Sequence, residues 1–186
     1  MERFKGKFFF KLLLVGELAV GKTSTVLRYV ENRFAADLQP TIGANFLVKN
    51  IKKGEFQAIL QIWDIGGHVR RVQDIGKTFY QGVDGVLFIS DLTREETIEP
   101  LLEWSSTVQK HSPTFSKVLI GNKADIEENR TVTDQQLAEI AAKLDVDVKF
   151  VTSAKTGEGV PEVFEFLTLA IAARKGLLKK SVPHSD

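Results

Sequence analysis

The feature that most constrains the fold of this chain is the glycine-rich run at residues 16–23, which fits the pattern G-x-x-x-x-G-K-[ST]. An apolar run from Phe8 to Val15 precedes it, and the residues from Thr23 to Glu31 have helical spacing. Backbone N–H groups of such a loop turn inward around phosphate oxygens, and the N-terminus of the following helix favours an anion. The pattern therefore predicts a buried parallel strand, a phosphate-binding loop and a helix. Lys22 can reach the β- and γ-phosphates of a nucleotide, and the Thr23 hydroxyl can hold Mg²⁺.

Size and composition indicate a single soluble domain. The 186 residues are enough for one α/β domain with a sizeable core. Lys and Arg total 25 against 24 Asp and Glu, so the net charge of +1 gives no reason to expect nucleic acid as a partner. The lack of cysteine excludes disulfides, thiolate metal sites, prenylation and palmitoylation, and Glu2 excludes N-myristoylation. We therefore expect a cytoplasmic monomer with no direct lipid anchor, peripheral at membranes only through its partners.

Strand-like and helix-like segments alternate along residues 8–174. Further strands are predicted at 43–51, 56–63, 85–90, 118–121 and 146–151, and further helices at 94–110, 133–144 and 160–173. The alternation predicts an α/β fold: a doubly wound, mostly parallel six-stranded sheet with one antiparallel edge strand and helices on both faces. Lys53 and Gly54 are expected to form the turn of the antiparallel pair, and Thr133 and Gln136 have capping-box spacing. We divide the chain into a lead-in at 1–7, one domain at 8–174 and a flexible tail at 175–186.

A later segment indicates which base the nucleotide carries. Asn122-Lys123-Ala124-Asp125 follows the apolar strand at 118–121, and the Asp125 carboxylate can accept hydrogen bonds from the N1–H and 2-amino groups of guanine. Adenine has neither donor, so adenine would leave a buried Asp125 unpaired at a cost of roughly 1–3 kcal/mol. Asn122 can tie this segment to the phosphate loop, and the aliphatic stem of Lys123 can cover one face of the base. Taken alone, the run is better interpreted as an ordinary turn.

A second run, Ser153-Ala154-Lys155, follows the strand that ends at Val151. With the phosphate loop and the segment at 122–125, it resembles the guanine-nucleotide motifs of the Ras-type small GTPases, in the same order and at compatible spacing, over about residues 8–173. The resemblance implies a Ras-like G domain of the P-loop NTPase class, with GTP and GDP as substrate and product and Mg²⁺ as cofactor. It also implies effector proteins, an exchange factor and a GTPase-activating protein as partners.

Two segments locate the resemblance within the family. Residues 41–46 and 60–64 look most like the Rab branch, whereas Gly66-Gly67 after Trp63-Asp64-Ile65 looks more like the Arf branch. Unlike ordinary Rab proteins, the chain has no cysteine for prenylation. It is identified as a divergent or early-branching member, or as a chain that lacks its natural C-terminus.

The resemblance also implies which residues bind the nucleotide. The Ala154 N–H would bind guanine O6, Ser153 would brace the loop, and Lys155 would lie beside the base. Phe34 would pack edge-on against guanine, or else it is an ordinary core residue at a helix end. The predicted nucleotide site comprises Gly16, Glu17, Leu18, Ala19, Val20, Gly21, Lys22, Thr23, Ser24, Phe34, Thr41, Gly67, Asn122, Lys123, Asp125, Ser153, Ala154 and Lys155.

Phosphoryl transfer from GTP to water needs positioning and charge neutralisation more than covalent chemistry. By resemblance, Thr23 and Thr41 would bind Mg²⁺ directly, and Asp64 would bind it through a water. Lys22 would neutralise phosphate charge, and the Gly67 N–H would bind the γ-phosphate. The residues assigned to catalysis are Lys22, Thr41, Gly67 and, weakly, His68.

The same implied contacts predict a conformational switch. Loss of the γ-phosphate would remove the anchors of residues 35–46 and 65–80, so a partner could read a surface that exists only in the GTP state. The apolar candidates for that surface are Phe46, Trp63 and Phe79 or Tyr80, and each could also belong partly to the core.

Two departures from the family bear on hydrolysis. His68 stands where most members carry a water-orienting Gln, and a protonated imidazole has no acceptor, so His68 has either a weak water-positioning role or none. Leu18 lies near where an arginine finger would enter, whereas Arg70 and Arg71 are solvated helix residues unless one acts in cis. We expect a slow GTP hydrolase that works as a switch and depends on an activating protein. The alternative is an interaction module with negligible hydrolysis, whereas the guanine motifs disfavour an ATPase or a nucleoside kinase.

Overall fold

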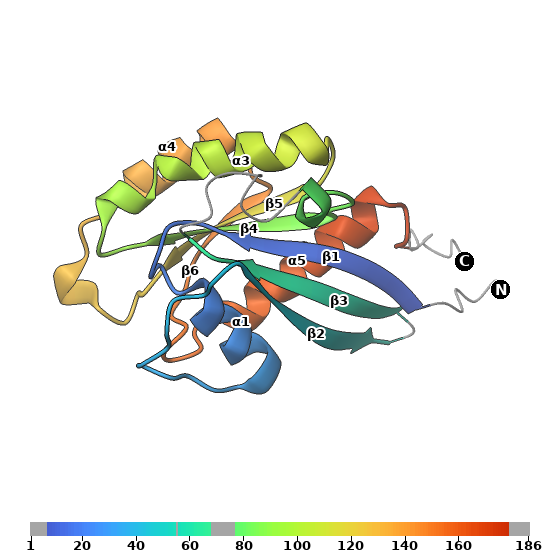
Figure 1. Cartoon of the computed structure of the whole chain (residues 1–186), viewed down its shortest axis with the longest axis horizontal. Coiled ribbons are helices and arrows are strands. Elements are labelled where there is room, and N and C mark those ends of the chain that lie inside the picture. Colours follow the sequence, from blue (N-terminus) through green and yellow to red (C-terminus); the bar gives the residue numbers. More distant parts are fainter. Residues whose placement is uncertain (1–6, 55, 68–76, 179–186) are drawn as a thin grey trace, which may run out of the picture.

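The computed structural model describes residues 7–54, 56–67 and 77–178, which form a central sheet between two layers of helices (Figure 1). The strands are β1 (Lys7–Val15), β2 (Ala44–Lys53), β3 (Phe56–Ile65), β4 (Gly85–Asp91), β5 (Ser116–Asn122) and β6 (Val148–Val151). The helices in these ranges are α1 (Lys22–Glu31), α3 (Pro100–His111), α4 (Asp134–Leu144) and α5 (Val160–Arg174), with short 3₁₀ helices η1 (Lys77–Phe79), η2 (Glu95–Thr97) and η3 (Glu127–Asn129). None of these helices has the length and apolar character needed to cross a membrane.

The six-stranded sheet has the order β2-β3-β1-β4-β5-β6. Neighbouring strands are parallel except for β2 and β3, which form an antiparallel pair at one edge. Gly54, in the turn between them, has a φ of 60°, which glycine adopts without a steric penalty. The predicted doubly wound sheet with one antiparallel edge strand is confirmed.

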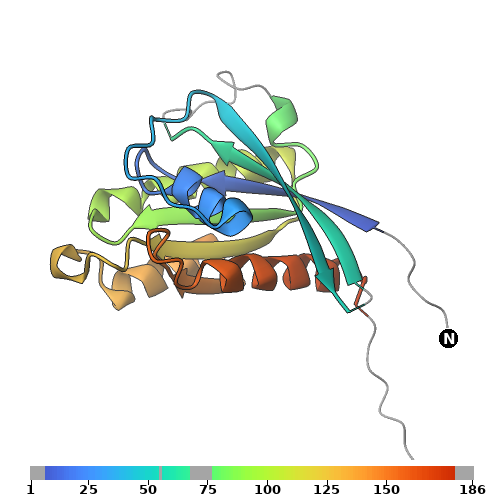
Figure 2. The ribbon, with the colours of Figure 1, turned by 90° about the horizontal axis from the view of Figure 1, so that it is seen from below.

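Alternate residues of β1 supply two separate cores. Leu12 and Leu14 pack on the side of α1 and α5, whereas Leu13 and Val15 pack on the side of α3 and α4. Figure 1 shows α3 and α4 above the sheet, α1 below it and α5 running behind β1 and β3, and Figure 2 shows the molecule from below. β4 lies between the two cores and is buried along its whole length. The predicted inner face of α5 is buried as expected: Val163, Phe164, Leu167 and Ile171.

The prediction of one helix over 94–110 is wrong at its start. Residues Glu95–Thr97 form the separate 3₁₀ helix η2, and α3 begins only at Pro100. Proline suits the first helical position because its missing N–H would have no partner there. Upstream, the Thr97 hydroxyl donates to the Arg94 carbonyl oxygen at 2.7 Å and closes a tight turn. Arg94 therefore lies in a turn directly after β4 and not on the helix.

The two ends of α4 explain its boundaries. The predicted capping box is confirmed, because the Gln136 N–H donates to the Thr133 hydroxyl and the Gln136 side chain accepts from the Thr133 N–H. At the other end, Asp145 has a φ of 52°, and the Val146 N–H donates to the Ala141 carbonyl oxygen at 3.2 Å. This C-cap occupies the Val146 backbone, so β6 starts at 148 and not at the predicted 146.

Candidate nucleotide-binding site

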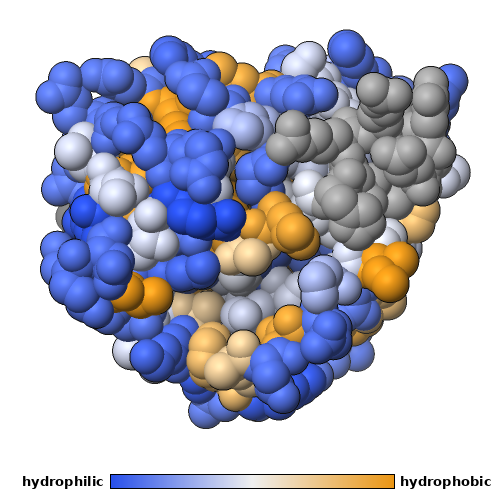
Figure 3. Space-filling model, turned by 60° about the vertical axis from the view of Figure 1, so that its left-hand side comes forward, coloured by the Kyte–Doolittle hydropathy of each residue, from blue (hydrophilic) through white to orange (hydrophobic). Residues whose placement is uncertain are grey.

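The loops that follow β1, β3, β5 and β6 meet at the carboxyl end of the sheet, which Figure 3 turns toward the reader. A cavity of about 460 Å³ opens there, a size typical of small-molecule sites. It is lined by these loops and by residues 34–36 and 38–41. All predicted nucleotide-site residues line it except Gly16, Glu17, Val20 and Ser153. Six further residues line the cavity, although they belong to no motif and were not predicted for the site: Ala35, Ala36, Leu38, Gln39, Pro40 and Ile126.

The phosphate loop at residues 16–23 has a shape that requires glycine at two positions. Gly16 and Gly21 have φ angles of +146° and +95°. A Cβ atom on Gly16 would lie 2.2 Å from the Ile89 carbonyl oxygen, and one on Gly21 would lie 2.3 Å from Asn122 Nδ2. The loop therefore packs directly against the ends of β4 and β5, with no room for side chains at these glycines.

The Lys22 side chain folds back over the loop. Its ammonium group donates to the Gly16 and Glu17 carbonyl oxygens at 2.9 and 2.8 Å. Burial lowers the pKa of Lys22 to about 8, although nearby Asp64 and Glu17 act in the opposite direction. A largely desolvated ammonium group is stabilised by an added anion, so this position suits a phosphate.

Three oxygen-bearing side chains converge beside the phosphate loop. The Thr23 hydroxyl donates to Asp64 Oδ2 at 2.5 Å and lies 2.8 Å from the Thr41 hydroxyl, which is 3.4 Å from the same carboxylate oxygen. Burial raises the pKa of Asp64, although both hydroxyls and Lys22 lower it. Asp64 Oδ1 is buried and has no hydrogen-bond partner among the residues that the structure describes. An unpaired buried carboxylate oxygen is suited to hold a cation or its bound water.

This donor set fits Mg²⁺. Within residues 7–54, 56–67 and 77–178, no group of three or more His, Cys, Asp and Glu side chains could hold a metal ion. Mg²⁺ is typically bound by one or two carboxylates, waters and substrate phosphates, rather than by a cage of protein ligands. Two hydroxyls and one carboxylate beside a phosphate loop match that chemistry and do not match a zinc site.

Asn122, at the end of β5, joins the base-side loops to the phosphate loop. Its Nδ2 donates to the Val20 carbonyl oxygen at 2.9 Å. Its Oδ1 accepts from the Thr152 hydroxyl at 3.2 Å and from the Ala154 N–H at 3.1 Å. The Ala154 N–H, which the family resemblance assigns to guanine O6, therefore has a protein acceptor here, and its contact with the base stays a prediction.

The Asp125 carboxylate is held in place at the rim of the cavity. Asp125 Oδ1 accepts from the Ser153 hydroxyl at 2.6 Å, and the Lys155 ammonium lies 3.6 Å from Oδ2. The Ser153 hydroxyl also accepts from the Thr156 N–H at 3.1 Å. The side chain is 10% exposed, so few waters compete for its free acceptor positions. A base with adjacent N–H donors matches this carboxylate.

Arg28 on α1 is a site residue that sequence reasoning missed. Its Nε donates to the Ala154 carbonyl oxygen at 3.0 Å and its Nη2 to the Lys155 carbonyl oxygen at 2.6 Å. The helix after the phosphate loop thus holds the backbone of the 153–155 loop. No motif marks Arg28, because its acceptors are backbone atoms more than a hundred residues away in the chain.

The remaining predicted residues divide into two groups. Phe34 is 38% exposed at the cavity, which does not fit its interpretation as a core residue. Gly67 packs against the phosphate loop so closely that a Cβ atom would lie 2.4 Å from the Leu18 backbone nitrogen. Leu18 itself lines the cavity and is 44% exposed. Three further residues, His68, Arg70 and Arg71, lie outside the described residues.

Three of the aromatic residues predicted for a partner surface lie together, and their role in binding a partner stays a prediction. Trp63 lies between Phe46 and Phe79, with ring centroids 4.7 and 5.2 Å away. Phe46 is 46% exposed, whereas Tyr80 is fully buried. Tyr80 is therefore a core residue, and Phe79 is the member of the predicted pair that joins this cluster.

A doubly wound sheet, a glycine-dependent phosphate loop with a buried lysine, and a second loop bearing a carboxylate suited to guanine together define the class of small GTPases. A profile of the Ras family matches residues 11–173. The chain is similar to the Ras-related protein Rab-2B of Dictyostelium discoideum, with 39% identity over 84% of this chain and 77% of the relative. It is 38% identical to the Ras-related protein SEC4 of Candida albicans over 83% of this chain and 73% of the relative. It is 35% identical to the Ras-related protein Rab-3C of Bos taurus over 86% and 70%.

The chain belongs to the Ras family, and these relatives place it in the Rab branch. Proteins of this family are GTPase switches that bind GTP and GDP with Mg²⁺ and work with effectors, exchange factors and activating proteins.

Proposed function

We propose that this protein is a switch that binds effector proteins in the GTP state and hydrolyses GTP slowly to GDP and phosphate. One observation carries the proposal: a single cavity joins Lys22 of the phosphate loop, the oxygens around Asp64 and the loop that bears Asp125. Such a site can hold the phosphates and the base of one nucleotide together. Family membership supports GTPase activity in general.

The phosphate side of the site would act through charge and position. Lys22 would bind the β- and γ-phosphates, and the Gly67 N–H would donate to the γ-phosphate. Thr23, Thr41 and Asp64 would hold Mg²⁺, which neutralises phosphate charge when bound. Thr41 and Gly67 lie outside the phosphate loop, so loss of the γ-phosphate would release both of their segments and change the surface that a partner reads.

A single-turnover assay tests hydrolysis. With Mg²⁺, the protein should convert bound GTP to GDP faster than a buffer blank, and Lys22→Ala should lower the rate toward the blank. A wild-type rate equal to that of the blank would refute the proposal. Tight ATP binding with no response to GTP would overturn the assignment of the base.

The Asp125 carboxylate gives a direct test of base recognition. Asp125→Asn replaces an acceptor with a donor that faces the guanine donors, so the affinity for GDP should fall at least about 100-fold. Asp145→Asn is the matched control, because Asp145 is 98% exposed at the end of α4. Equal GDP affinities for the two variants would contradict the role of Asp125.

A second candidate function rests on His68, which by the family resemblance stands where most members carry a water-orienting Gln. The protein would then bind GTP as an interaction module with negligible hydrolysis. Ras-type proteins hydrolyse GTP unaided at only about 10⁻⁴ s⁻¹. A clear rise in rate for His68→Gln would support this candidate, and an unchanged rate would contradict it.

The domain limits and the cellular setting are part of the same proposal. Residues 8–174 would act as a monomeric G domain, with the lead-in at 1–7 and the tail at 175–186 outside it. The protein would be cytoplasmic, with membrane contact made through its partners. Flotation with anionic liposomes, with and without residues 1–7, tests this, since binding by the full chain alone would show a direct membrane contact.

A further inference from the structure

A buried carboxylate at the end of β4 links three loops of the candidate site. Asp91 ends β4, and its side chain is fully buried. Asp91 Oδ1 accepts from the Thr93 N–H at 2.9 Å and the Thr93 hydroxyl at 2.7 Å. Asp91 Oδ2 accepts from Arg94 Nε at 3.0 Å and from the Lys123 ammonium at 2.7 Å. Both oxygens are thus paired, and Lys123 is connected through Asp91 to the turn that carries Arg94.

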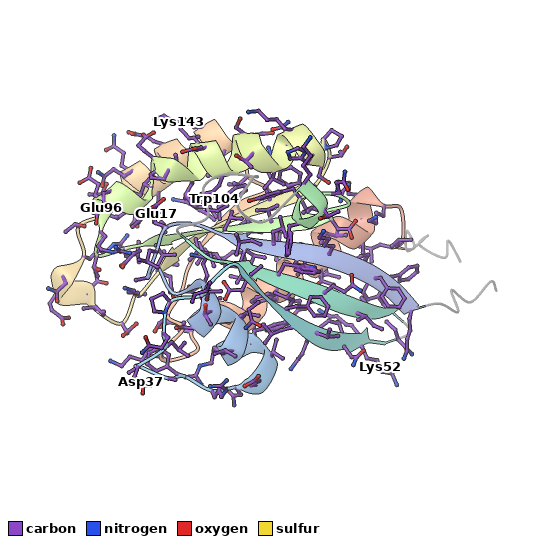
Figure 4. The ribbon with its side chains drawn as sticks, in the orientation of Figure 1. Glu17, Asp37, Lys52, Glu96, Trp104 and Lys143 are labelled. Carbon is purple, nitrogen blue, oxygen red and sulfur yellow. The ribbon has the colours of Figure 1, made fainter. Side chains whose placement is uncertain are left out.

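Arg94 extends this network to the phosphate loop. Its Nη2 donates to the Leu18 carbonyl oxygen at 2.7 Å. The planar guanidinium can serve two acceptors at once because its donors have a fixed fork geometry. The turn and the phosphate loop lie at the same end of the molecule, as the positions of Glu96 and Glu17 show in Figure 4. No nucleotide motif of the sequence contains Arg94.

We propose that Arg94 is a positioning residue that orients the Leu18–Ala19 peptide toward the β-phosphate of the nucleotide and thereby slows nucleotide release. This inference rests on the proposed nucleotide site. The carbonyl and the N–H of one trans peptide point in opposite directions, so a donor on the Leu18 carbonyl turns the Ala19 N–H away from Arg94. Both Leu18 and Ala19 line the cavity. Ala19 also has a φ of 61°, which alanine rarely adopts, so this peptide needs an external hold.

A second contact keeps the loop attached when Arg94 is removed. Asn122 Nδ2 donates to the Val20 carbonyl oxygen, on the other side of Ala19. The Arg94→Ala protein should therefore fold and bind nucleotide, with only one peptide of the loop less well oriented. The expected effect is on the phosphate contacts and not on the base contacts.

Release of fluorescently labelled GDP from the full chain in Mg²⁺ tests the inference. Arg94→Ala should release GDP at least about tenfold faster than the wild type. Arg94→Lys should show a smaller increase, because one ammonium cannot serve both Asp91 and Leu18 with the same geometry. Arg130→Ala is the matched control, since Arg130 also donates to a carboxylate, Asp134, and to a backbone carbonyl, Val132, but lies away from the cavity. It should stay within twofold of the wild type.

A second readout separates positioning from general loosening. Competition against labelled GDP gives the dissociation constants of unlabelled GDP and of GMP, which lacks the β-phosphate. Arg94→Ala should weaken GDP at least about tenfold and leave GMP within twofold, whereas a loosened domain would weaken both. Equal losses for GDP and GMP, or a GDP release rate like that of Arg130→Ala, would overturn the inference. Failure of the wild type to bind GDP would instead refute the proposed function.

Discussion

Replacing Asn122 with alanine should destabilise the nucleotide-free protein by about 3 kcal/mol. The Asn122 amide makes three hydrogen bonds, with the Val20 carbonyl at 2.9 Å, the Thr152 hydroxyl at 3.2 Å and the Ala154 N–H at 3.1 Å. Asn122 is 1% exposed and its partner residues Val20, Thr152 and Ala154 are at most 3% exposed, so these are buried hydrogen bonds. Each buried bond contributes about 1 kcal/mol net, and the three together give the expected loss.

Urea unfolding in EDTA, with nucleotide removed, measures this loss without the contribution of ligand binding. In thermal unfolding, the same loss should lower the midpoint by about 6–12 °C, at roughly 2–4 °C per kcal/mol for a chain of this size. Asn129→Ala is the matched control, because Asn129 is exposed on η3, and its effect should stay within about 0.5 kcal/mol. If Asn122→Ala costs less than about 1 kcal/mol, the three contacts do not hold the loops together as argued.

Three further predictions concern the phosphate side of the site and the buried network. Gly67→Ala places a Cβ atom 2.4 Å from the Leu18 nitrogen, so titrations should show a larger loss of affinity for GTP than for GDP; equal losses would contradict the γ-phosphate contact. We expect Mg²⁺ to slow GDP release from the wild type and Asp64→Asn to abolish most of this slowing, and a full Mg²⁺ effect in the variant would exclude Asp64 from the metal site. Burial alone would raise the pKa of Asp91, but hydrogen bonds from Lys123 and the turn after β4 hold it below its ordinary 3.8. The folded state therefore favours the ionised form, and its stabilisation, complete above about pH 4, is lost as the pH falls through the lowered pKa. Asp91→Asn should flatten this acid limb in urea unfolding, and parallel acid limbs would refute the assignment.

The fold could be predicted because its signals are local. Apolar runs of strand length alternate with helical spacing, and that alternation alone specifies a doubly wound sheet. The phosphate loop was also predictable, because Gly16 and Gly21 must have left-handed φ angles and no side chain against β4 and β5. The glycines of the motif are therefore the residues that the backbone geometry requires at these two positions.

Other parts of the site could not be predicted because they depend on contacts between distant segments. Arg28 and Arg94 bond to backbone carbonyl oxygens, and a carbonyl acceptor leaves no mark in the sequence. The start of α3 was misplaced because the apolar pattern continues through Ile98, although Pro100 sets the actual first turn. Tyr80 was a candidate for the predicted partner surface, but it is fully buried because of tertiary packing, which its neighbours in sequence do not indicate.

Backbone strain in the site occurs in the two loops that charged side chains hold. Four non-glycine residues of the described chain have left-handed φ angles, and two of them, Asn32 and Asp145, are helix C-caps. The other two are Ala19, in the phosphate loop, and Lys123, in the segment at 122–125 that carries Asp125. Such a conformation costs roughly 1–2 kcal/mol, whereas a hydrogen bond to a charged group contributes about 1.5–3 kcal/mol. Arg94 donates to the carbonyl oxygen of Leu18, directly before Ala19, and to the carboxylate of Asp91, which pairs with Lys123. These contacts are therefore large enough to offset the strain in both loops. The turn after β4, which carries no nucleotide motif, thus stabilises the geometry of the two loops that do.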